Sequence, residues 1–157
     1  HIIQFGGHKY AAGVTLKEEN YQAFKTAFEA QVAQTLTATQ KKQTLDIDVG
    51  LPFAAITPKL LRILKQMEPF GPENSSPVFY TDGVVDSGYA KLVGQDKNHI
   101  KARFVQGASS PIDAIGFGLG KKMNLLKKGT PLRIAYALEE NVWQGNVSVQ
   151  LRLKDIE

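Results

Sequence analysis

The spacing of hydrophobic residues changes along the first third of the chain, and each change predicts a different element. Short apolar runs at residues 2–5 and 11–16 flank a glycine pair and predict two strands. From residue 18 the apolar residues recur every three or four positions, which predicts an amphipathic helix. Its apolar positions are Tyr21, Phe24, Phe28, Val32 and Leu36. Residues 35–44 are rich in Thr, Gln and Lys and are predicted to be a loop or linker.

The next stretch predicts one strand and one helix. Residues 45–50 alternate between apolar and polar, which is typical of a half-exposed strand. Thr57 followed by Pro58 is a favourable start for a helix, because threonine caps the end and proline fits the first helical position. The apolar positions that follow are Leu60, Leu61, Ile63, Leu64 and Met67. Two prolines and a glycine in residues 68–72 end this helix.

From residue 77 onward the pattern predicts strands. The β-like runs lie at residues 78–85, 91–94, 99–105, 112–117, 132–138 and 147–153, and a short helix is predicted at 121–126. With the run at 91–94 leading through a turn into 99–105, the count is five strands with a helix before the fourth, which predicts a small Greek-key barrel such as an OB-fold. The expected class is therefore α+β. A small α/β remnant (1–50) precedes a connector helix and linker (51–76), and a five-stranded OB-like barrel (77–157) completes the chain.

Composition narrows the functional classes. The 157 residues are 43% hydrophobic and 22% charged, which is typical of a globular protein. Cysteine is absent, which excludes a disulfide framework, a thiolate zinc site and a cysteine nucleophile, and fits a reducing, cytoplasmic location. We expect no membrane span and no signal peptide, since neither pattern is present. The chain starts with His1 rather than methionine, so we expect a larger gene product.

Charge is unevenly distributed. Residues 1–50 hold five basic and five acidic residues, so the net charge of +4 comes entirely from residues 51–157. A mildly basic second half permits an anionic partner, and an ordinary solvated surface would have the same balance.

One strand carries the strongest candidate site. His99, Lys101 and Arg103 share one outer face, because they alternate with apolar residues. These are Ile100, Ala102 and Phe104. That face is either a solubilising surface or a groove for a single-stranded nucleic acid, which small barrels bind with basic and aromatic residues. The residues expected to join it are Tyr89, Lys91 and Trp143. Trp143 is equally consistent with a half-buried core position.

Other motifs are less specific. The turn Gly6-Gly7-His8 either exposes backbone amides and an imidazole to an anion or is an ordinary hairpin turn. The glycines of residues 116–121 do not have the spacing of a phosphate-binding loop and predict a strand end that turns into a helix. Asp46 and Asp48 have no histidine pair beside them and predict a solvated strand edge. We find no catalytic constellation and no metal site.

Four segments together resemble a known family. Residues 6–8 and 11–16, with Asn20, Phe24 and Phe28, resemble the tail of the DHH-associated domain that follows the catalytic domain of DHH phosphoesterases. Residues 67–74 resemble the connector to the OB-fold in the RecJ family of single-stranded-DNA-specific exonucleases. Residues 113–118 and 149–156 resemble the barrel of the same family. The resemblance covers nearly the whole chain in the correct order.

This resemblance implies a part of a 5′→3′ exonuclease of recombination and repair. The family holds Mn²⁺ or Mg²⁺ in an Asp-His-His domain that these residues do not include, so we expect this chain to be inactive alone and to bind no cofactor. By resemblance Gly6, Gly7 and His8 line the nucleotide or phosphate side of the cleft, and the barrel guides single-stranded DNA. Two alternatives remain. One is a module that recruits a single-stranded DNA-binding protein, and the other is a different DHH phosphoesterase acting on small nucleotides, which the barrel disfavours.

Overall fold

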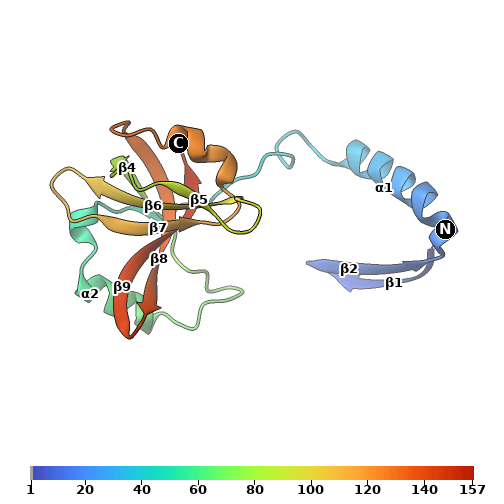
Figure 1. Ribbon diagram of the computed structural model, residues 1–157. Helices are drawn as coiled ribbons and strands as arrows, with labels where there is room; N and C mark the ends of the chain where they lie inside the picture. Colours follow the sequence, from blue (N-terminus) through green and yellow to red (C-terminus); the bar gives the residue numbers. More distant parts are fainter. Residues whose placement is uncertain (1) are drawn as a thin grey trace. The chain divides into compact units, whose positions relative to one another are not determined.

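The computed structural model describes residues 2–157 and separates the chain into two units (Figure 1). The first ends at Thr44 and the second spans Leu45–Glu157. The sequence placed residues 45–50 with the first unit. In the structure they belong to the second, because the backbone N–H of Asp48 donates to Val78 O at 2.9 Å and that of Leu51 donates to Tyr80 O at 2.8 Å.

The first unit is a hairpin and a helix. Strands β1 (Ile2–His8) and β2 (Ala11–Leu16) pair antiparallel, with His8 opposite Ala11. A short 3₁₀ helix, η1 (Glu18–Asn20), leads into α1 (Tyr21–Thr35), as the three- and four-residue spacing predicts. Gly7 is required here, because a Cβ atom would lie 2.5 Å from Ala11 O. None of the elements of this unit contains a buried residue.

A connector leads into the second unit. The two-residue strand β3 (Val49–Gly50) runs parallel to β4, and the 3₁₀ helix η2 (Phe53–Ala55) follows. Helix α2 (Pro58–Gln66) starts where the sequence predicts, and the Thr57 side chain accepts a hydrogen bond from Leu60 N at 3.3 Å. Phe53 is buried at 3% exposure, so this connector packs against the barrel.

The barrel itself is closed by five strands. They are β4 (Phe79–Asp86), β6 (His99–Gln106), β7 (Ile112–Gly116), β8 (Leu132–Trp143) and β9 (Asn146–Ile156). Hydrogen-bonded neighbours run β4–β8–β9–β7–β6, and β6 pairs with β4 again to complete the ring. The short strand β5 (Lys91–Val93) adds to β6, and the 3₁₀ helix η3 (Gly120–Leu125) joins β7 to β8. The α+β class with an OB-like barrel is confirmed.

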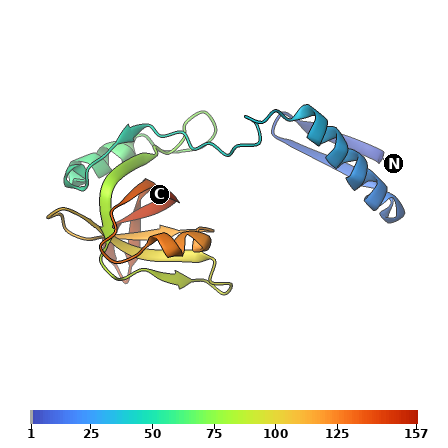
Figure 2. The ribbon, with the colours of Figure 1, turned by 90° about the horizontal axis from the view of Figure 1, so that it is seen from above.

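Strand β4 bends strongly so that it can pair on both sides (Figure 2). Its first half pairs with β8 and its end pairs with β6, and the register shifts between Thr81 and Val84. Gly83 lies in this irregularity at φ +68°, a conformation that glycine adopts without steric cost. This bend closes the ring.

The core fills the barrel interior. Ile100, Ala102 and Phe104 are fully buried, as the alternation in β6 predicts, together with Ile134, Tyr136 and Leu151 from β8 and β9. The hydroxyl of Tyr136 lies 2.8 Å from Thr81 Oγ1 and donates to Leu51 O at 3.2 Å. Burial raises the pKa of Tyr136 to about 12. This buried polar group is therefore satisfied, and it ties the connector to the barrel.

Candidate nucleic-acid interface

The outer surface of β5, β6 and β7 brings two lysines, an arginine and a histidine together. Because Ile100, Ala102 and Phe104 point inward, His99, Lys101 and Arg103 lie on the opposite face of β6. The register places Lys91 opposite Lys101 and Asp113 opposite Arg103. The structure thus brings together the residues that the sequence assigned to this strand face.

Tyr89 is the aromatic centre of one end of this face. The Nζ atom of Lys91 lies 5.0 Å from its ring centroid, and the Cζ atom of Arg103 lies 4.9 Å from it. Both separations are within the range of a cation–π interaction. Tyr89 is 37% exposed, so part of its ring remains open to a ligand.

Arg103 is committed to an ion pair. Its Nε donates to Asp113 Oδ1 at 2.7 Å and its Nη2 donates to Asp113 Oδ2 at 3.2 Å. This hydrogen-bonded pair raises the pKa of Arg103 above its ordinary value. Arg103 therefore holds Tyr89 and Asp113 in place, and its own positive charge is already partly neutralised by Asp113.

Lys91 and Lys101 differ from Arg103 in this respect. Among residues 2–157, neither lysine has a carboxylate within ion-pair distance. Two uncompensated ammonium groups directly opposite each other are unfavourable in a sheet, and an anion between them would relieve the repulsion. These two lysines are therefore the candidates on this face for contact with an anion.

The other end of the face contains two residues that sequence reasoning missed, Phe117 and Arg152. The Phe117 ring lies edge-on to His99, with 5.2 Å between centroids, and Arg152 Cζ lies 5.5 Å from the same ring. The Arg152 guanidinium also pairs with Glu139 at 2.9 Å. The pairing of β6 with β7 is the feature that would have revealed Phe117. Because Ile100 lies opposite Gly116, the adjacent residues His99 and Phe117 come together.

Two further site regions that the sequence predicts stay predictions. Trp143 ends β8 opposite Asn146, and its side chain lies outside the described part of the structure, so its role stays a prediction. Gly6, Gly7 and His8 belong to the first unit. There His8 Nδ1 accepts a hydrogen bond from Tyr10 N at 3.2 Å, which closes the hairpin turn. Their nucleotide-binding role also stays a prediction.

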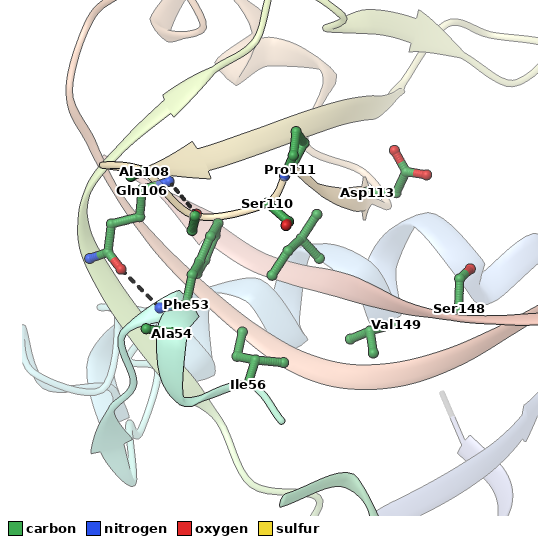
Figure 3. A pocket seen from close by; sticks show the side chains of 12 residues that line it. Phe53, Ala54, Ile56, Gln106, Ala108, Ser110, Pro111, Asp113, Ser148 and Val149 are labelled. Atoms are coloured by element: carbon green, nitrogen blue, oxygen red, sulfur yellow. Dashed lines mark hydrogen bonds between the residues drawn. The ribbon is translucent and has the colours of Figure 1, made fainter. Parts of the chain in front are cut away.

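A pocket of the second unit is lined by residues that include Asp113, the ion-pair partner of Arg103 (Figure 3). It has a volume of about 730 Å³ and is lined by η2, by the loop between β6 and β7 and by the start of β9. Gln106 holds its wall together, since its Oε1 accepts from Phe53 N at 2.9 Å and its backbone N–H donates to Ser109 Oγ at 3.0 Å. Asp113 is the single charged lining residue and is already paired with Arg103, so the lining of this pocket offers a phosphate no cationic side chain. The basic face is therefore the better candidate for nucleic acid.

The described residues contain neither a metal-binding cluster nor a membrane-spanning helix. Within residues 2–157 there is no group of three or more histidine or carboxylate side chains placed to hold a metal ion. Over the same residues, no helix has the length and apolar character needed to cross a membrane.

Comparison with known proteins identifies the barrel. A family model described as the RecJ OB domain matches residues 47–155. The chain belongs to this family. The match contains every residue of the basic face and the whole connector, and it begins after Gly6, Gly7 and His8. The assignment of residues 1–50 to a DHH-associated domain stays a prediction.

Related proteins match nearly the whole of this chain, including the residues that precede the RecJ OB domain. The chain is 28% identical over 154 residues to the single-stranded-DNA-specific exonuclease RecJ of Bacillus subtilis, covering 98% of this chain and 19% of the relative. It is 29% identical to the protein of the same name from Haemophilus influenzae, covering 99% and 27%. The crystal structure of RecJ with Mn²⁺ from Thermus thermophilus aligns at a TM-score of 0.65 and 27% identity, covering 99% and 22%. The chain thus spans about a fifth to a quarter of these relatives.

Proposed function

We propose that the barrel binds single-stranded DNA across the face of β5, β6 and β7, as part of a RecJ-like single-stranded-DNA-specific exonuclease. The observation that carries this is the pair Lys91 and Lys101, which oppose each other without a carboxylate partner among the described residues and lie beside the exposed Tyr89. Cations for the phosphates and a ring for the bases are what single-strand binding surfaces combine. The names of the relatives supply the substrate class.

In this proposal the barrel guides the strand and hydrolysis takes place elsewhere in the enzyme. The Asp-His-His region of the family would hold Mn²⁺ or Mg²⁺, and Gly6, Gly7 and His8 would line its phosphate side. We expect no digestion of labelled single-stranded DNA by this chain with either metal. A role in recombination and repair, and a cytoplasmic location, belong to the same proposal.

The test is fluorescence anisotropy with a labelled oligothymidylate across a salt series. Each phosphate neutralised on a single strand contributes a slope of about −0.7 to the dependence of log affinity on log salt. The double variant Lys91→Ala/Lys101→Ala should therefore bind more weakly and flatten the slope by up to about 1.4. Arg103→Ala is less informative, since it also releases Asp113 from its ion pair.

The matched control is Lys41→Ala/Lys42→Ala, which makes the same change in net charge in the polar segment before the barrel. We expect it to keep the affinity and slope of the parent. If the two double variants behave alike, the face of β5, β6 and β7 is not the DNA path. Retained binding of a single-stranded DNA-binding protein in that case would favour the alternative of a protein-recruiting module.

A further inference from the structure

Phe117 is a large apolar side chain that the barrel does not bury. It is 56% exposed, although it directly follows the buried end of β7. The turn that presents it depends on its neighbours: a Cβ atom on Gly116 would lie 2.9 Å from Leu119, and Gly118 has φ +71°. Glycine on both sides therefore lets the chain turn sharply with the ring directed outward.

Two side chains hold this ring in place. The Gly118 backbone N–H donates to His99 Nδ1 at 3.0 Å, which fixes the imidazole edge-on to Phe117 with an angle of 70° between the ring planes. Arg152 lies over the ring and is itself fixed by Glu139. The hydrogen bond to Gly118 occupies one nitrogen of His99, so this histidine is better suited to positioning Phe117 than to binding a phosphate through that atom.

The Phe117 ring and the exposed ring of Tyr89 lie at opposite ends of the face. Tyr89 contacts Arg103 and Phe117 contacts His99, and these partners are four residues apart on β6. At about 3.3 Å per residue the two aromatic sites are about 13 Å apart along the strand. Lys101 lies midway between them, opposite Lys91. The face therefore presents an aromatic ring, a cation pair and a second aromatic ring in sequence.

We propose that Phe117 is a second base-stacking site on this face, positioned by His99 and Arg152, and that it binds an unpaired nucleobase of the strand whose phosphates contact Lys91 and Lys101. This inference rests on the proposed function and extends it. A ring that stacks on a base needs that base to be unpaired, so the site would favour a single strand over a duplex.

The experiment compares two labelled probes of equal length, an oligothymidylate and an abasic strand with the same phosphates. Phe117→Leu keeps an apolar side chain and removes the ring. It should weaken binding of the oligothymidylate by about 5-fold to about 150-fold, the range expected for one lost base stack. Binding of the abasic strand and the salt slope should not change. Phe117→Trp should restore binding, and Ile63→Ala, an exposed apolar residue on α2, serves as the control.

The positioning role of His99 has its own readout. His99→Ala should reduce the preference for the oligothymidylate over the abasic strand, and this reduction should vanish when Phe117 is already leucine. Equal loss on both probes, or no loss on either, would overturn the stacking site. If Lys91→Ala/Lys101→Ala still flattens the salt slope in that case, the proposed function stands without it. A parent chain that binds neither probe would overturn both proposals.

Discussion

The two units of the chain use similar amphipathic patterns with opposite results. In the barrel the apolar residues of every ring strand meet in a closed interior, and Ile100, Phe104, Ile134 and Leu151 are fully buried. In the hairpin and helix of the first unit Phe5 remains 79% exposed and Phe28 remains 58% exposed. An apolar pattern predicts an element, but burial requires enough elements to enclose its apolar face. Stability within this chain is therefore expected to reside in residues 45–157.

The largest expected difference between the units is in protection from proteolysis. The polar segment from Thr35 to Thr44 has no apolar face to bury, so its opening should cost little free energy. Opening of the barrel should cost most of the global free energy of unfolding, about 5–15 kcal/mol for a typical domain. Limited proteolysis followed by mass spectrometry should show first cuts at 35–44 and a persistent fragment close to 45–157. First cuts within residues 98–105 would contradict the comparison.

Paired truncations of phenylalanine should separate the units energetically. Phe104 is fully buried in the barrel, so Phe104→Ala should lower the free energy of unfolding by about 3–5 kcal/mol. Phe24 in α1 stacks on Phe28 at 5.7 Å but lies in a unit without a core, so Phe24→Ala should cost far less. Urea unfolding followed by circular dichroism measures both changes. Similar losses for the two variants would mean that the first unit contributes to the same cooperative core.

A smaller change in the free energy of unfolding is expected for the hydrogen bond of Tyr136 inside the barrel. Tyr136→Phe removes a hydroxyl that bonds to Leu51 O, and we expect a loss of about 1 kcal/mol near neutral pH. The raised pKa of Tyr136 adds a signature in alkali. Its stabilising contribution is fully present below pH 10, the ordinary tyrosine value, and is lost as the pH rises through about 12.

The free energy of unfolding of the parent should consequently fall more steeply between these pH values than that of Tyr136→Phe. Denaturant titrations at several alkaline pH values measure the two slopes. If the free energies of unfolding of the two proteins fell in parallel with pH, ionisation of the buried hydroxyl would not be coupled to folding.

The local alternation of β6 predicted which residues are inside the barrel and which share its outer face. Pairing partners were harder to predict. Residues 45–50 have the alternation of a strand, but only Val49–Gly50 form one in the structure. Alternation alone does not reveal that β3 pairs with β4 or that Asp48 Oδ2 accepts from Val78 N at 2.8 Å. Asp48 is thus more than a solvated edge residue.

The candidate site shows the same division between local and long-range information. Lys91, Lys101 and Arg103 were predictable because they lie on strands with clear alternation. Phe117 was not, because the sequence placed it in the strand at 112–117, whereas β7 ends at Gly116 and Phe117 lies in the turn that follows. Its contact with His99 follows from the register of β6 and β7. Arg152 joins the same cluster through the parallel pairing of β7 and β9, where it opposes Ile115. Such contacts depend on the closed barrel rather than on any one segment.

The most direct test of the central proposal is to map where a single strand contacts the chain. Two-dimensional NMR of the ¹⁵N-labelled chain, titrated with an oligothymidylate, reports on every backbone amide. We predict the largest shifts at residues 89–91, 99–103 and 115–118, and little change in η2 and residues 108–111, which line the pocket near Asp113. Shifts centred on that pocket, with the amides of β5 and β6 unchanged, would contradict the proposal that this face binds DNA.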